Sequence, residues 1–142
     1  MEIAYNIPNK GTRAFVESIV SFFVQDLKLQ KSKFHLEVFT KRGMADEDGC
    51  RGMVTKLGPN LLVMFLDSKL DVERLVLTIA HEMVHVKQHA RGQLKDIAGR
   101  TQVRYWMGKK INKTYFNQPW EIEAFSKERI LANKVFQIIN KR

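Results

Sequence analysis

The stretch that decides the fold is His81-Glu82-Met83-Val84-His85-Val86-Lys87-Gln88-His89-Ala90, which contains the pattern His-Glu-x-x-His. In an α-helix, residues four apart differ by about 40° around the axis, so His81 and His85 project from the same side. Two neutral imidazoles placed in this way can bind one divalent metal ion, usually zinc. Glu82 is not placed to bind the metal, but it can take a proton from a metal-bound water. The spacing therefore predicts attack of water on a carbonyl group, typically that of a peptide bond.

The helix that carries these histidines is expected from about residue 71 to Arg91, with Ser68 or Asp71 as its N-cap. With a step of about 100° per residue, its apolar side chains fall on one side and the two histidines on the opposite side. The apolar stripe contains Val72, Val76, Ile79, Met83, Val86 and Ala90. His89 lies about 6 Å further along the axis than His85, and three ligands on one straight helix cannot surround a tetrahedral ion. We therefore expect His89 to support the site without binding the metal, or to lie at the surface.

The third protein ligand is expected from the last helix, which begins near Pro119. Because no histidine follows His89, carboxylates are the remaining candidates. In a helical projection Glu121 falls within the apolar stripe, whereas Glu123 falls on the opposite, solvent-facing side. A carboxylate that points inward is costly unless it is paired or bound to a metal, which favours Glu121. Glu123 is the alternative ligand, since helix starts are often distorted, and a surface acid that stabilises the helix dipole is the alternative role for Glu121. Glu128 also faces inward and is a candidate to orient a ligand histidine through the second ring nitrogen.

The remaining pattern predicts a single α+β domain over residues 1–142, a length that suits one domain with its own core. An amphipathic helix is expected from about Thr12, capped by Gly11 or Thr12, after a loose or edge segment at residues 1–10. Three alternating or apolar runs predict strands at residues 34–40, 53–57 and 61–66. The turns between them indicate a small, mainly antiparallel three-stranded sheet. Residues 41–51 are expected as a polar loop, and residues 93–118 as an extended or hairpin-like segment.

Composition narrows the class of protein further. Hydrophobic residues make up 44% of the chain, and a single cysteine, Cys50, excludes an internal disulfide and fits a reducing compartment. No basic-then-apolar leader and no long apolar run is present, which predicts a cytoplasmic protein without a membrane span. The net charge of +9 favours acidic partners such as nucleic acid, or is only a solvated basic surface. The basic and aromatic residues between 93 and 118 either contact nucleic acid or shape a substrate cleft.

The pattern His81-Glu82-x-x-His85 followed by Glu121-x-x-Ala124 resembles the gluzincin class of zinc metallopeptidases. The wider stretches His-Glu-Met-Val-His-Val-Lys-Gln and Pro-Trp-Glu-Ile-Glu-Ala are similar to small phage and bacterial proteins of SprT-like or minigluzincin type, over roughly residues 60–130. The resemblance implies a minimal zincin-like fold and one zinc ion held by His81, His85 and Glu121. It also implies that Glu82 acts as general base on a peptide or protein substrate. The chain departs from the pattern in having Phe125, and not an aspartate, four residues after Glu121. It also lacks the third histidine of SprT proteins proper.

Three functions remain open on the sequence. The first is a zinc endopeptidase of narrow specificity, cytoplasmic and phage-encoded in a bacterial host. The second is a DNA-associated protein of SprT-like architecture, and the third is a zinc-binding structural module with weak or no catalysis. For the peptidase, Tyr115 or Tyr105 is a candidate donor to the oxyanion. The strand at residues 61–66, or a neighbour, is the expected sheet edge along which an extended peptide pairs.

Overall fold

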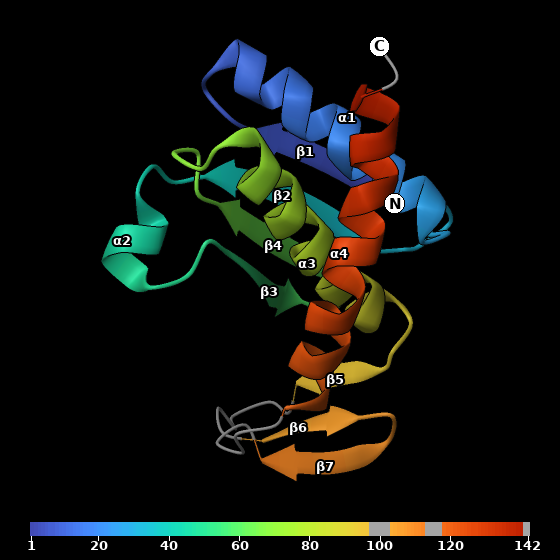
Figure 1. Cartoon of the computed structure of the whole chain (residues 1–142). Coiled ribbons are helices and arrows are strands. Elements are labelled where there is room, and N and C mark those ends of the chain that lie inside the picture. The colour runs from blue at the N-terminus through green and yellow to red at the C-terminus, as the bar shows by residue number, and fades with distance from the viewer. Residues whose placement is uncertain (97–102, 113–117, 141–142) are drawn as a thin grey trace.

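The computed structural model describes residues 1–96, 103–112 and 118–140, which form helices and two sheets in an α+β architecture (Figure 1). The strands are β1 (Glu2–Asn6), β2 (His35–Thr40), β3 (Gly52–Gly58), β4 (Leu61–Leu66), β5 (Leu94–Asp96), β6 (Val103–Trp106) and β7 (Lys109–Asn112). The helices are α1 (Lys10–Asp26), α2 (Met44–Asp48), α3 (Val72–Ala90) and α4 (Pro119–Asn140). The predicted α+β class is confirmed.

The larger sheet has four strands in the order β1-β2-β4-β3. Strands β1 and β2 pair in parallel, as do β2 and β4, and only β3 runs antiparallel to its neighbour β4. The prediction of a three-stranded, mainly antiparallel sheet is therefore wrong. The apolar run of β4 occupies an interior position with a neighbour on each side, and helix α1 provides the crossover that parallel β1 and β2 require.

The N-caps of the helices agree in part with those predicted from the sequence. Helix α3 is capped by Asp71, one of the two predicted caps, whose Oδ1 accepts a hydrogen bond from the backbone N–H of Arg74 at 2.8 Å. Helix α1 is capped by Asn9 and not by Gly11 or Thr12, because the Asn9 Oδ1 accepts from the Thr12 N–H at 2.9 Å. Residues 1–10 supply the edge strand β1, and the expected loop at residues 41–51 contains the short helix α2.

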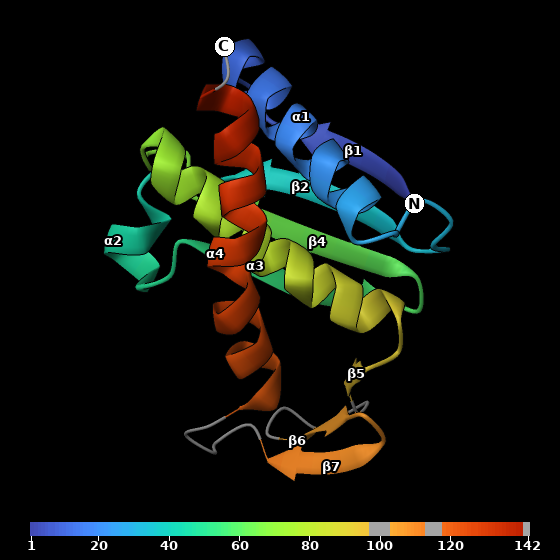
Figure 2. The same ribbon diagram turned by 45° about the vertical axis from the view of Figure 1, so that its right-hand side comes forward.

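Helices α1 and α3 pack on one face of the four-stranded sheet, and α4 crosses over α3 (Figures 1 and 2). Side chains from all these elements form the core, including Val16, Val20, Phe23, Leu36, Val38, Leu62, Met64, Val76, Ile79, Met83, Val86, Ala124 and Ala132. Helix α3 is therefore covered by the sheet on one side and by α4 on another. Met83 lies in the core, while Thr78 and Gln88, which lie on the polar side of the helix, are 6% and 0% exposed. The cover provided by α4 brings side chains of the two helices together.

The smaller sheet, with strand order β5-β6-β7, lies between the end of α3 and the start of α4 (Figure 2). Both pairs in it are antiparallel, and β6 and β7 form a hairpin through Met107 and Gly108, both of which have positive φ. This agrees with the hairpin-like segment expected after residue 93. None of the helices in the described ranges combines the length and the apolar character that crossing a membrane requires.

Candidate metal centre

Helices α3 and α4 bring three potential metal ligands together. His81 and His85 lie one turn apart on α3, and Glu121 lies in the first turn of α4. The Oε1 atom of Glu121 is 3.1 Å from His81 Nε2 and 2.6 Å from His85 Nε2. One ligand atom from each residue lies within 4.8 Å of the other two. The predicted meeting of two histidines with a carboxylate from the last helix is therefore present in the structure.

The spacing and chemistry of these donors fit a metal ion. In a tetrahedral site with metal–ligand distances of about 2.1 Å, neighbouring ligand atoms lie about 3.4 Å apart. The carboxylate-to-imidazole distances of 2.6 and 3.1 Å need only a small widening to reach that value. Two imidazoles and one carboxylate are also a donor set found in catalytic zinc sites, where the fourth position stays open. His81, His85 and Glu121 can therefore hold a metal ion.

The electrostatics of the group favour an ionised carboxylate. Burial by itself raises the pKa of Glu121, but hydrogen bonds with His81 and His85 outweigh it and hold that pKa well below its usual range. For His81, burial opposes the charged form, yet the neighbouring Glu121, Glu82 and Glu128 raise its pKa above the ordinary value. Glu121 is thus in the negative form that metal binding requires.

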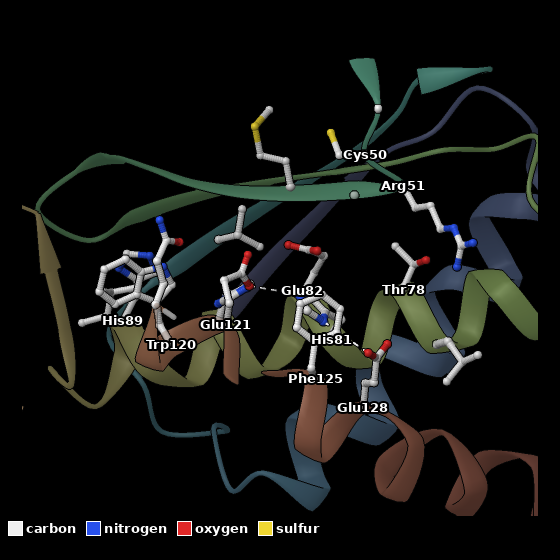
Figure 3. A pocket seen from close by; sticks show the side chains of 18 of the residues that line it. Cys50, Arg51, Thr78, His81, Glu82, His89, Trp120, Glu121, Phe125 and Glu128 are labelled. Carbon is white, nitrogen blue, oxygen red and sulfur yellow. Dashed lines mark hydrogen bonds and ion pairs between the residues drawn. The ribbon is translucent and has the colours of Figure 1, made fainter. Parts of the chain in front are cut away.

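Glu82 lies beside this group as a buried carboxyl. It is 5% exposed, and it points from α3 toward the strand that follows Cys50 and Arg51 (Figure 3). Burial raises the pKa of Glu82, and the neighbouring His85 and His81 only partly offset that effect. A buried carboxyl with a raised pKa next to a potential metal site is a candidate for proton transfer.

The ligands and Glu82 line a cavity of about 560 Å³. One wall consists of residues 49–54, which lead into and begin β3, and the opposite walls come from α3 and α4 (Figure 3). Strand β3 is an edge of the four-stranded sheet, whereas β4 lies between β2 and β3. Residues 61–66 are therefore not the sheet edge that the sequence suggested, and the neighbouring strand β3 takes that place.

Glu123 does not face solvent, so this part of the helical projection is wrong. Its side chain is only 19% exposed, and its Oε1 accepts hydrogen bonds from Lys87 Nζ at 2.8 Å and from Gln88 Nε2 at 2.9 Å. Burial opposes its ionisation, but these bonds and one from Lys127 lower the pKa of Glu123 to about 2. The projection failed because α4 crosses α3 and buries more than one side of its first turns.

His89 is buried as well, at 4% exposure, so a surface position for it is wrong. It lines the cavity beyond His85, and within the described residues its Nδ1 has no hydrogen-bond partner. Burial lowers the pKa of His89 to about 4, which makes it neutral at physiological pH. It is not among the three residues whose ligand atoms converge.

The other candidates lie at different distances from the ligands. Glu128 lines the cavity, with its Oε1 3.7 Å from His81 Nδ1, which is an ion-pair distance and too long for a hydrogen bond. Tyr105 is 39% exposed on β6 and is not among the residues that line the cavity. Tyr115 lies outside the described residues.

Several residues near the site were not assigned a role from the sequence. The Oε1 atom of Gln88 lies 2.8 Å from His85 Nδ1, and its position three residues after a ligand histidine is the sequence signal for this contact. Arg104 and Trp120 also line the cavity, and the guanidinium carbon lies 5.3 Å from the centre of the indole ring. Their meeting has no short-range sequence signal, because β6 and α4 come together only in the fold.

The site therefore combines two ligands and a buried carboxyl from α3 with one ligand from α4, beside an edge strand. These parts are separated by 40 residues in the sequence between His81 and Glu121. The chain matches no protein-family model, no curated protein and no solved structure.

Proposed function

We propose that the protein is a zinc-dependent peptidase that hydrolyses peptide bonds in a peptide or protein substrate. The observation that carries the proposal is the convergence of His81, His85 and Glu121 next to the buried carboxyl of Glu82. Three protein ligands that leave a position open are typical of catalytic zinc sites, whereas structural zinc sites are closed by four. The cavity in front of the ligands supports a substrate-binding role.

When bound, zinc supplies Lewis acidity, which polarises a carbonyl group and makes water more acidic. Glu82 accepts the proton that the attacking water loses and later donates it to the nitrogen of the cleaved peptide bond. Its burial supports both halves of this role, because a raised pKa brings the carboxyl closer to the pH at which it must take up and release a proton. Glu121 and the two histidines would hold the metal.

The edge strand β3 supports an extended peptide as the substrate. Its outer edge has no strand beside it within the described residues, and residues 49–54 line the cavity that contains Glu82. An extended peptide can add to such an edge through main-chain hydrogen bonds, with its side chains directed alternately toward and away from the cavity. A substrate bound in this way runs past the metal ligands with its carbonyl groups accessible.

A Glu82→Gln substitution tests the proposal. It removes the proton acceptor and leaves the three ligands, so we expect zinc content to stay unchanged and hydrolysis of an unfolded protein to fall by about 10²–10⁴-fold. Glu73→Gln is the matched control, because Glu73 lies on the same helix but is exposed, and it forms an ion pair with Arg129 at 3.5 Å. A Glu82→Gln variant that keeps both zinc and full activity would refute the mechanism. A wild-type protein that binds zinc without hydrolysing peptides would instead be a zinc-binding structural module.

A second candidate function, contact with single-stranded nucleic acid, is favoured by one row of side chains on the smaller sheet. Lys95, Tyr105 and Lys110 are cross-strand neighbours on β5, β6 and β7, and all three are exposed. An aromatic ring between two cations can stack on a base while the cations pair with phosphates. A gel shift at low salt that weakens with added salt, and weakens again in Tyr105→Ala, is the expected result. Absence of binding at low salt excludes this function.

A further inference from the structure

The side chain of Gln88 forms a completely buried link between α3 and α4. It is 0% exposed. Its Oε1 lies 2.8 Å from His85 Nδ1, and its Nε2 donates to the backbone oxygen of Trp120 and to Glu123 Oε1, both at 2.9 Å. All the hydrogen-bonding groups of the amide thus lie in a buried junction, where each unmade bond is costly.

The two contacts of the Gln88 nitrogen determine that Nδ1 of His85 acts as a hydrogen-bond donor. The Trp120 carbonyl and the Glu123 carboxylate can only accept hydrogen bonds, so the amide NH₂ group must face them and the amide oxygen must face His85. An amide oxygen also only accepts, so His85 Nδ1 carries a proton. This leaves Nε2, which lies 2.6 Å from Glu121 Oε1, as the ring nitrogen that is available to a metal ion.

The same amide holds the part of α4 that carries Glu121. Its two acceptors, Trp120 and Glu123, lie on either side of Glu121 in the sequence. Lys87, whose side chain is 3% exposed, adds a bond to the same Glu123 oxygen at 2.8 Å. Glu123 is therefore occupied in joining the helices, and the first turn of α4 has little freedom to shift relative to His85.

We propose that Gln88 is a positioning residue for the metal site, which sets the ring orientation and tautomer of His85 and the placement of Glu121 at the same time. The inference rests on the metal-binding part of the proposed function. It does not extend to His81, because the distance of 3.7 Å between His81 Nδ1 and Glu128 Oε1 is too long for a hydrogen bond. Residues that hydrogen-bond to a ligand histidine typically change metal affinity by about 10–100-fold when they are mutated.

Gln88→Met tests the proposal, because methionine keeps the length of the side chain and removes the three hydrogen bonds. We expect zinc affinity, measured by competition with a chromophoric chelator, to fall by about 10–100-fold. Lys87→Met is the matched control, since it removes a buried partner of Glu123 from the same junction without touching His85. Its zinc affinity is expected to change by less than about threefold. In the zinc-loaded wild-type protein, ¹⁵N NMR should find the His85 proton on Nδ1.

Two results would overturn the inference: equal zinc affinity in Gln88→Met and wild type, or equal losses in Gln88→Met and Lys87→Met. If circular dichroism shows Gln88→Met unfolded, the ¹⁵N NMR measurement on the zinc-loaded wild-type protein decides. A proton on His85 Nδ1 is expected, and a proton on Nε2 with Nδ1 unprotonated refutes the inference. Failure of the wild-type protein to bind zinc would refute the proposed function as well. If the wild-type protein binds zinc, the results for the variants test only the inference about Gln88.

Discussion

Gly52 on the edge strand β3 lies directly against Glu82 on helix α3. A Cβ atom at position 52 would come within 3.0 Å of Glu82 Cγ, 2.7 Å of Thr78 Cγ2 and 3.2 Å of the Phe65 backbone oxygen. The 2.7 Å distance is shorter than real contacts of a Cβ atom, and the other two are tighter than most of them, so glycine lets the strand approach the helix more closely than a residue with a side chain would. Because position 52 has no side chain, the cavity wall can lie directly against the carboxyl proposed for proton transfer.

Gly52→Ala is expected to push β3 away from α3. Because the added methyl group meets the helix and a backbone oxygen, the free energy of unfolding should fall by about 1–3 kcal/mol in chemical denaturation. Displacement of Glu82 and of the peptide-binding edge should lower kcat/KM by about tenfold or more. Gly58→Ala on the same strand is the control, because among the described residues a Cβ there meets Leu61 Cβ alone, at an ordinary 3.7 Å. Equal effects of the two substitutions would contradict the close-packing argument.

Substitutions of Glu121 and Glu123 should separate metal binding from stability. Glu121→Ala removes a ligand, so zinc content after dialysis should fall to near zero while the protein stays folded. Glu123→Ala should keep zinc within about 100-fold of the wild-type affinity, but lose about 3 kcal/mol of stability, because it leaves the buried Lys87 without its partner. Elemental analysis and urea unfolding measure the two effects. Loss of zinc from Glu123→Ala with full retention in Glu121→Ala would reverse the ligand assignment.

His89 should make the metal-free protein less stable in mild acid. Its pKa is lowered from 6.5 to about 4 by burial; Asp96 opposes this effect, while Arg104, His85 and Lys56 reinforce it. Between these two pH values the unfolded chain binds a proton that the folded protein does not, so stability falls as the pH drops from 6.5 to about 4. The total contribution is about 3 kcal/mol.

The substitution His89→Leu removes this titration and the unpartnered ring nitrogen. With a chelator present, urea unfolding should show that the variant gains stability relative to wild type as the pH falls from 7.5 to about 4.5. A stability difference between the two proteins that is independent of pH would show that His89 does not have the lowered pKa.

Asp67 should anchor the segment that leads into the cavity wall. Its side chain accepts hydrogen bonds from the backbone N–H groups of Gly43, Ala45 and Lys69 at 2.8–2.9 Å, and its own N–H donates to Arg51 at 2.9 Å. Burial opposes its ionisation, but the three backbone donors outweigh this effect and lower the pKa of Asp67. Its contribution is therefore present above the unfolded-state pKa of about 3.9 and is lost as the pH falls through the lower folded-state value.

Asp67→Asn is accordingly expected to cost about 2 kcal/mol of stability at pH 7, because the amide cannot accept from all three donors. The difference from wild type should shrink as the pH approaches 2. Thermal unfolding at both pH values measures it. Equal stability of the two proteins at neutral pH would show that the anchor contributes little.

The sequence by itself determined the features that depend on local geometry. The four-residue spacing of His81 and His85 places both on one side of any α-helix, whatever surrounds it. The cap at Asp71 and the strand at residues 61–66 follow from short-range patterns in the same way, and both agree with the structure. The choice of Glu121 followed from its place in the apolar stripe, and it is the carboxylate that meets the histidines.

Only the tertiary structure decided which elements meet. Alternating or apolar runs do not encode a pairing partner, so the parallel pairing of β2 with β4 and the extra strand β1 could not be read from them. A helical projection assumes one buried side, and it misplaced Glu123 and left Gln88 without a role because α4 crosses α3 and buries both. Contacts of this kind depend on the angle and distance between two helices, which are set by packing throughout the core and not by residues near the contact.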